Sequence, residues 1–242
     1  MKISPTLIFS LLLSLVLASN AYSKSASQKF AGTNLTKVKV KKTSGNIEIY
    51  PATGNDVVIE KAGPNCQTAI FIDRTTLKVL ETDPNVGKNC PAPLKVYAPV
   101  QIKVDVEHKS GNITAQNFPG NLDLELDNGT ITCTSCTGHV DADVDNGKIS
   151  LTEFAGSADL DTDTGDIDVQ IAKAHNGGGD LELETQIGSI KVAVPASLDV
   201  MANTHSFIGK IHNDFGPASS KLPVLRIEAE TRVGSITINK VN

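Results

Sequence analysis

Hydrophobic and polar residues alternate along most of this chain, in a pattern that repeats every 18 residues. Four such blocks follow one another without a gap between residues 103 and 174. In the second block, residues 122–133 read LDLELDNGTITC: leucines alternate with acidic residues up to an Asn-Gly turn, after which apolar positions alternate again. Alternation with a period of two is typical of strands with one buried face. Each block therefore predicts two strands joined by a turn.

The same residue types recur at fixed positions of each block. The ninth position is always glycine, the eleventh isoleucine and the third aspartate: Gly111, Gly129, Gly147 and Gly165; Ile113, Ile131, Ile149 and Ile167; Asp105, Asp123, Asp141 and Asp159. Related copies at 38–49, 181–192, 202–213 and 227–238 bring the Gly-x-Ile signature to eight copies. A short fixed period indicates units that stack on their neighbours, and glycine suits a turn that needs positive φ.

Stacked units of this kind predict an all-β fold, a single-stranded parallel β-helix (β-solenoid) with about 18 residues per coil. Between residues 50 and 99 the repeat is absent, and apolar runs at 57–59, 69–72 and 77–80 predict ordinary strands. Terminal units of a stack must protect an open sheet edge. We therefore interpret residues 24–100 as N-terminal strands and an atypical β cap, continuous with a repeat β-helix at 101–242.

The first residues have the pattern of a secretory signal peptide. Lys2 precedes an apolar run at 7–17, and small residues follow it up to Ser23. We interpret residues 1–23 as a signal peptide and expect the protein in the periplasm or at the cell surface. The apolar run is too short for an ordinary membrane span and no later segment approaches its length, so we expect no stable span.

Four cysteines in an exported chain can form disulfides, in three alternative pairings. Cys66 and Cys90 are the two cysteines of the N-terminal region, and we expect them to pair. Cys133 and Cys136 have CxxC spacing, but both fall at apolar positions of the repeat. We therefore predict two buried cysteines, bridged or not, in place of a redox centre. No second Cys or His pair has the spacing for a zinc site.

One further arrangement carries a family resemblance. Residues 94–99, LKVYAP, lead into IKVDV at 102–106 and then Ser-Gly-Asn-Ile at 110–113, and IKVAVP recurs at 190–195. This order resembles the bacterial "putative adhesin" domain family of unknown function, exported β-helical proteins rich in SGDI-like repeats. The resemblance covers residues 38–238. It implies a parallel β-helix in the cell envelope, and it supplies no catalytic motif.

Acidic residues form columns across the predicted stack. The third position holds Asp105, Asp123, Asp141, Asp159, Glu182 and Glu228, and the fifth holds Glu107, Glu125, Asp143, Asp161, Glu184 and Glu230. The seventh position adds Asp127, Asp145 and Asp163. The earliest copy carries Lys39 and Lys41 at the two main columns, and the copy around Gly209 carries Asn203 and His205.

Stacked carboxylates about 4.8 Å apart repel one another by about 0.9 kcal/mol per adjacent pair in water. Bound cations would relieve this repulsion, and Ca²⁺ prefers carboxylate oxygens, so weak divalent cation binding on the acidic face is one hypothesis. We favour the simpler interpretation, a solvated outer face whose charges prevent sheets from aggregating.

Composition and the lack of known catalytic motifs argue against several classes of function. The net charge of −5, the 4% of aromatic residues and the lack of tryptophan argue against nucleic acid as a partner. The five histidines (His108, His139, His175, His205 and His212) are scattered, and no HExxH, GxSxG or P-loop motif occurs. Gly177, Gly178 and Gly179 predict a flexible loop. We therefore assign no catalytic, cofactor-binding or metal-ligating residues and no cofactor.

The pattern thus favours an exported, non-enzymatic cell-envelope protein with an adhesin-like binding or scaffold role, whose envelope or surface ligand is unknown. The alternatives are a polysaccharide-active β-helical enzyme and a cation-binding structural envelope protein. A groove with one atypical cluster of carboxylates and a basic residue would favour the enzyme. Smooth ladders on every face would favour the binding or scaffold role.

Overall fold

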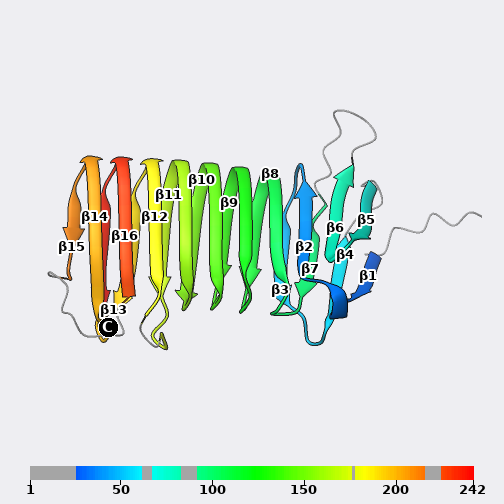
Figure 1. The fold of residues 1–242 in the computed structure, drawn as a ribbon. Helices are drawn as coiled ribbons and strands as arrows, with labels where there is room; N and C mark the ends of the chain where they lie inside the picture. Colours follow the sequence, from blue (N-terminus) through cyan, green and yellow to red (C-terminus); the bar gives the residue numbers. More distant parts are fainter. Residues whose placement is uncertain (1–25, 62–66, 83–91, 176–177, 216–224) are drawn as a thin grey trace, which may run out of the picture.

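The computed structural model describes residues 26–61, 67–82, 92–175, 178–215 and 225–242, whose strands form one elongated stack (Figure 1). The predicted signal peptide, Cys66 and Cys90 lie outside these residues. The N-terminal elements are β1 (Ala26–Ala31), the 3-10 helix η1 (Gly32–Asn34), β2 (Lys37–Lys42), β3 (Ile47–Pro51), β4 (Asp56–Lys61), β5 (Gln67–Asp73), β6 (Thr76–Thr82) and β7 (Leu94–Ala98). The four gapless blocks form β8 (Lys103–Gln116), β9 (Leu122–Thr134), β10 (His139–Phe154) and β11 (Ser157–Ile171). The remaining strands are β12 (Asp180–Ile187), β13 (Ile190–Pro195), β14 (Val200–Ile208), β15 (Ile211–Asn213), β16 (Leu225–Val233) and β17 (Ile236–Val241).

The four gapless blocks lie side by side in the predicted register. Strands β8, β9, β10 and β11 pair in parallel, and over most of their length each residue lies opposite the residue 18 positions further on. Asp105, Asp123 and Asp141 are thus direct neighbours across three strands. Each strand continues through its turn glycine from one face of the stack to the other. The predicted all-β, mostly parallel arrangement is confirmed.

The C-terminal units do not follow chain order. Strand β16 of the last copy pairs with β12 on one side and with β14 on the other, and β17 likewise lies between β13 and β15. In Figure 1 the red β16 stands between the yellow β12 and the orange β14. The last copy in sequence is therefore inserted into the stack, and the preceding copy, β14 and β15, forms its outer end.

The N-terminal end combines parallel and antiparallel strands. The predicted strands at 57–59, 69–72 and 77–80 are confirmed as parts of β4, β5 and β6. Strands β6 and β7 pair in parallel with β2 and β3, so they extend the stack by one unit that lacks the Gly-x-Ile turn. Beyond them, β5 pairs antiparallel with β6, and β4 antiparallel with β7 and β1.

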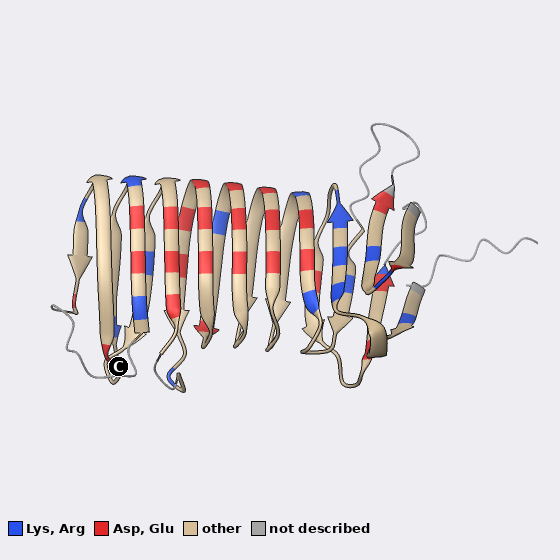
Figure 2. Cartoon of the chain, viewed as in Figure 1, with Lys and Arg blue, Asp and Glu red and all other residues tan. Residues whose placement is uncertain are grey.

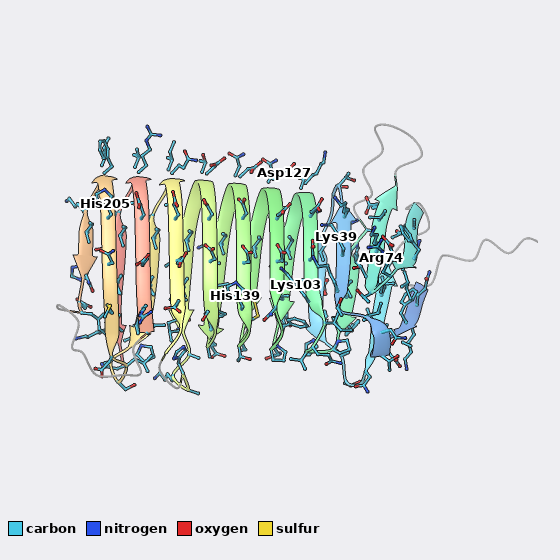
Figure 3. The ribbon with its side chains drawn as sticks, in the orientation of Figure 1. Lys39, Arg74, Lys103, Asp127, His139 and His205 are labelled. Atoms are coloured by element: carbon cyan, nitrogen blue, oxygen red, sulfur yellow. A yellow bond between two sulfur atoms is a disulfide. The ribbon has the colours of Figure 1, made fainter. Side chains whose placement is uncertain are left out.

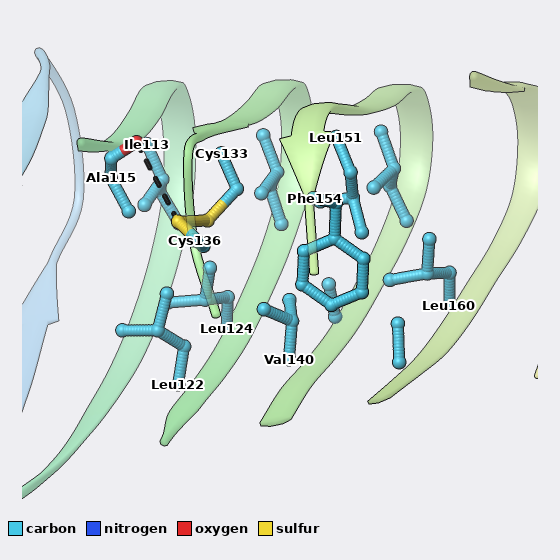
Figure 4. Close-up of a cluster of buried hydrophobic side chains, with 14 of the residues drawn as sticks. Ile113, Ala115, Leu122, Leu124, Cys133, Cys136, Val140, Leu151, Phe154 and Leu160 are labelled. Carbon is cyan, nitrogen blue, oxygen red and sulfur yellow. Dashed lines mark hydrogen bonds between the residues drawn. A yellow bond between two sulfur atoms is a disulfide. The ribbon is translucent and has the colours of Figure 1, made fainter. Parts of the chain in front are cut away.

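The interior is filled by aligned apolar columns (Figure 4). Ile113, Ile131 and Ile149 are fully buried in one column. Cys133 and Cys136 are buried too and form a disulfide, which confirms the predicted burial. Removal of apolar surface from water is the main force that stabilises such a core, and it contributes about 25 cal/mol of free energy per Å² buried.

One core column shifts at its end. The repeat predicts Ala172 as the successor of Phe118, Cys136 and Phe154, but Phe154 lies opposite Ile171 after an irregularity in the pairing of β10 with β11. Ile171 is buried, whereas Ala172 is half-buried and donates its N–H to the carbonyl of Phe154. The larger apolar side chain thus takes the core position.

The turn glycines pack backbone against backbone. A Cβ atom added to Gly129 would lie 1.8 Å from the carbonyl oxygen of Gly111, and the φ of Gly129 is 144°. The same approach, between 1.6 and 1.9 Å, runs through the stack in the order Gly45, Gly111, Gly129, Gly147, Gly165, Gly188, Gly234 and Gly209. Real Cβ atoms do not approach backbone this closely, so no other residue fits these positions. The order of this glycine ladder agrees with the inserted position of the last copy.

Side-chain donors reinforce the ladder where the core column beside it is polar. In three units a buried or half-buried hydroxyl donates to the glycine carbonyl of the neighbouring unit: Thr185 to Gly165 (3.0 Å), Thr231 to Gly188 (3.2 Å) and Ser206 to Gly234 (3.0 Å). Buried His108 occupies the same column, and its Nε2 lies 2.7 Å from the Gly45 carbonyl oxygen. These bonds satisfy polar groups that would otherwise be buried without partners.

Replacing Gly129 by alanine should destabilise the protein by about 3 kcal/mol, because the new methyl group would force two backbones apart and strain a positive φ. Gly54→Ala is the matched control, since a Cβ there meets no atom within 4 Å. Its free energy of unfolding should stay within about 0.5 kcal/mol of the parent value. Urea unfolding of the two variants measures both effects, and equal stability would contradict the ladder.

Candidate binding surface

Two unbroken rows of carboxylates cross one side of the stack, which we call the acidic face (Figure 2). The register places the predicted third-position and fifth-position residues in two columns over β8, β9, β10, β11, β12 and β16. The columns end at Asn203 and His205 on β14. The sequence therefore identified the members of the face, and the pairing shows their order in space.

Lysines from β2 neutralise the N-terminal end of this face. Lys39 lies opposite Asp105 in the register and contacts both Asp105 (3.2 Å) and Glu107 (2.6 Å). Lys37 also contacts Asp105, at 2.7 Å. Hydrogen bonds from Lys39 and then Lys41 hold the pKa of Glu107 below its usual value. Figure 3 shows Lys39 and Lys103 at this end of the face.

The carboxylates in the middle of the face lack such partners. Within the described ranges, no lysine, arginine or histidine lies within 4 Å of Asp141, Asp143, Asp159 or Asp161. Burial, followed by the charges of neighbouring carboxylates, raises the pKa of Asp141 and Asp143 above its usual value. The same causes, with Glu184 as the strongest neighbour, raise the pKa of Asp161 to about 6. The middle of the face thus concentrates uncompensated negative charge.

A shallow depression of about 190 Å³ lies toward the C-terminal end of this face. Six carboxylates line it, those of Asp159, Asp161, Glu182, Glu184, Glu228 and Glu230, together with Asn203 and His205. Among the described residues, no three His, Cys, Asp or Glu side chains converge as a bound metal ion requires. The face therefore offers a distributed negative field that attracts cationic groups.

The opposite face of the stack is mostly neutral. Its outward columns hold Thr114, Thr132 and Ser150 beside Gln116, Thr134, Thr152 and Gln170. Lys148 and Asp168 form an ion pair on this side. Hydroxyl and amide side chains here provide hydrogen-bonding groups without a strong field, so the acidic face is the more distinctive surface.

The remaining candidates of the sequence are not brought together. The CxxC pair is bridged inside the core and is not exposed for redox exchange. His108 and His175 are buried at different levels of the stack, and His212 contacts Asp214 at 3.0 Å near its end. Of the predicted glycine loop, Gly177 lies outside the described residues.

Sequence reasoning missed a groove of about 990 Å³ along one corner of the stack. Its lining includes Ser135, His139, Glu153, Lys173 and His175, alongside small residues of the corner. The insertion between the fourth block and β12, which breaks the 18-residue period, was the available signal. Among its described residues, the hydroxyl of Ser135 donates a hydrogen bond to Glu153 (2.9 Å).

The raised pKa of Asp161 predicts how stability depends on pH. Between its ordinary value of 3.8 and about 6, this carboxyl binds more protons in the folded than in the unfolded chain. The free energy of unfolding should therefore rise as pH falls from 7 to 5 at low salt. Below about pH 4 this gain is complete, and the lowered pKa of Glu107 then makes stability fall.

Urea unfolding between pH 4 and 8 measures this profile. Asp161→Asn should flatten the slope between pH 5 and 7 and stabilise the protein at pH 7 by about 1 kcal/mol. Glu153→Gln, at an exposed corner position, should keep the parent slope. Added salt at 1 M should flatten the profile too, because the screening length falls to about 3 Å. A parent stability that decreases steadily from pH 7 to 5 would contradict this account.

No helix in the ranges that the structure covers is long and apolar enough to cross a membrane. No curated protein matches the sequence. A structure from Bacteroides fragilis described as a "putative adhesin" is similar in fold, with a TM-score of 0.51 and 15% identity over 89% of this chain and 97% of that one. A "putative cell adhesion protein" from Clostridium sporogenes matches with a TM-score of 0.39 and 13% identity over 90% and 100% of the two chains.

The description of the Bacteroides fragilis structure names no enzymatic activity. The family model described as Toastrack DUF4097 matches residues 18–238, nearly the whole length of the sequence. The repeat, the parallel register and this match agree with the family resemblance that the sequence indicated. The chain belongs to the Toastrack DUF4097 family.

Proposed function

We propose that this protein is an exported, non-enzymatic component of the cell envelope that binds its ligand through the acidic face, in an adhesin-like or scaffold role. In this proposal residues 1–23 are a signal peptide, 24–100 form the cap, and 101–242 form a single-stranded parallel β-helix. The family membership and the similarity to a "putative adhesin" support this assignment. The location is the periplasm or the cell surface.

The observation that carries the proposal is the uniformity of the acidic face. Six successive strands present the same pair of carboxylates in register. A regular array of equivalent groups suits a ligand that itself repeats, because weak contacts made together give high avidity. The charge of the face favours a ligand that presents several cations, either its own basic groups or divalent ions bound to it.

The same uniformity argues for binding over the alternative, a polysaccharide-active enzyme. A glycosidase uses two carboxyl groups in unequal environments, separated by about 5 to 9.5 Å. Many pairs along these columns meet that spacing, so the spacing singles out none of them. The pKa of Asp161 is raised by burial and by neighbouring carboxylates, as are those of Asp141 and Asp143. The same kinds of cause act on all three carboxyl groups, so the environment of Asp161 differs from those of Asp141 and Asp143 only in degree.

A polylysine peptide serves as a probe of the acidic face. Replacing Glu182, Glu184, Glu228 and Glu230 by glutamine should weaken its binding about tenfold or more in 50 mM salt, because four adjacent charges are lost. The control replaces Asp56, Asp73, Glu153 and Asp214, which lie outside the face, by their amides and changes the net charge equally. It should weaken binding less than twofold. Equal losses in both variants would show a response to net charge alone.

Envelope fractions test the physiological role. The tagged protein should fractionate with the periplasm or the cell surface and retain an envelope ligand, and the four-glutamine variant should lose that ligand. Repeating the capture with and without Ca²⁺ separates direct binding from binding through divalent ions. Release of reducing ends from envelope polysaccharides by the purified protein would instead support the enzyme.

A further inference from the structure

Within the part of the chain that the structure describes, the outer edge of β14 is open. Strand β14 pairs with β16 on its inner side, and no strand of the described residues pairs with its other side. Figure 1 shows this strand at the C-terminal end of the stack. Its inward-facing Ala202, Thr204 and Ser206 are half-buried, where inner units hold fully buried side chains. An open edge presents unpaired N–H and C=O groups to another strand.

This edge lacks the charges that usually protect such strands. The inner strands β8 to β12 and β16 carry two carboxylates each on the acidic face, whereas β14 carries Asn203 and His205 there. Its sequence, VMANTHSFI, contains no proline and no Asp, Glu, Lys or Arg. Met201 (43%), Phe207 (76%) and Ile208 (60%) are exposed. Charged side chains and proline are two of the features by which natural edge strands prevent pairing, and β14 has neither.

The residues of β14 are complementary to those of the same strand in reverse. An antiparallel pair of β14 strands, related by a two-fold axis at Thr204, aligns each residue with a chemically matched one. The pairs are Val200 with Ile208, Met201 with Phe207, Ala202 with Ser206, Asn203 with His205, and Thr204 with itself. The two outer pairs are apolar and include a sulfur–aromatic contact, the small Ala202 meets the small Ser206, and the polar amide meets the imidazole.

We infer that β14 is the docking surface for a second copy of this chain, in a two-fold symmetric dimer that joins the two stacks end to end. A two-fold interface must be complementary to itself, which the pairing of β14 satisfies. In such a dimer, Asn203 and His205 of both copies lie between the acidic columns of the two stacks. Glu228 of one copy would lie about 14 Å from the partner's Glu230, three strand spacings away and beyond the screening length in physiological salt.

The opposite end of the stack does not offer the same match. Its edge strands are β5 and β1. Strand β5 carries Asp73, which pairs with Lys78 of β6, and β1 carries Lys29, which pairs with Asp56 of β4. Reversal of either sequence, QTAIFID or ASQKFA, aligns unlike residues. Pairing between β5 of one copy and β14 of the next would have no two-fold axis and would build a filament. A measurement of assembly size therefore distinguishes the β14–β14 dimer from a filament built by β5–β14 pairing.

Sedimentation equilibrium of the purified protein tests the inference. The parent protein should be a dimer at micromolar concentration. The double variant Asn203→Asp and His205→Glu places like charges opposite each other and should raise the dimer dissociation constant about tenfold or more. The control variant, Gln116→Glu with Gln170→Glu, adds two charges to exposed positions of inner strands and should remain dimeric. A monomeric parent, a filament, or a dimer that is insensitive to the edge variant would overturn the inference.

Cross-linking tests the register independently of affinity. Thr204→Cys places a thiol on the two-fold axis opposite its own copy, so oxidation should give a covalent dimer. Thr68→Cys, on the β5 edge, should stay monomeric under the same conditions. Circular dichroism and melting temperature confirm that each variant is folded. Cross-linking at residue 68 and none at residue 204 would place the interface at the β5 end of the stack and overturn the inference.

Discussion

The close approach of glycines in neighbouring units is the constraint on which the rest of the structure depends. A Cβ atom added to a turn glycine would lie within 2 Å of the carbonyl oxygen of the preceding glycine in the ladder, so there is no space for a side chain. Because these contacts fix one turn directly above another, the strands on both sides of the turn are held in register. The Ile, Leu and Val columns then align without gaps, and the core becomes a set of continuous ridges.

The same register has an electrostatic consequence. Alignment that buries Leu122, Leu124 and Leu126 also places the outward carboxylates of each unit beside those of the next. Lysines from β2 relieve this repulsion at the N-terminal end, and the neutral edge strand β14 ends it at the other. Between them the repulsion persists, and together with burial, the larger cause, it raises the pKa of Asp161. The most charged surface of the molecule is thus a by-product of its most regular packing.

Much of this architecture could be predicted from the sequence, because the 18-residue period of the gapless blocks specifies which residues lie side by side. The position of the last copy could not, since a repeating pattern shows which units stack but not in which order. The weak copy at 202–213 held a signal: it lacks both carboxylates, and it places the polar Thr204 in a column that holds Val, Leu or Ala in the neighbouring units. Such substitutions fit a terminal unit with one neighbour. The unit formed by β6 and β7 was missed as part of the stack because it has no Gly-x-Ile turn.

The order of the units can be measured directly by paired cysteines in the third-position column. Glu228 lies opposite both Glu182 and Asn203, whereas Glu182 and Asn203 are separated by a whole strand. Cysteine pairs at 182 and 228, and at 228 and 203, should therefore form disulfides on oxidation. A pair at 182 and 203 should not, because two strand spacings, about 9.6 Å, exceed the reach of a disulfide. A disulfide between 182 and 203, with none to 228, would show that the units stack in chain order and would contradict the account.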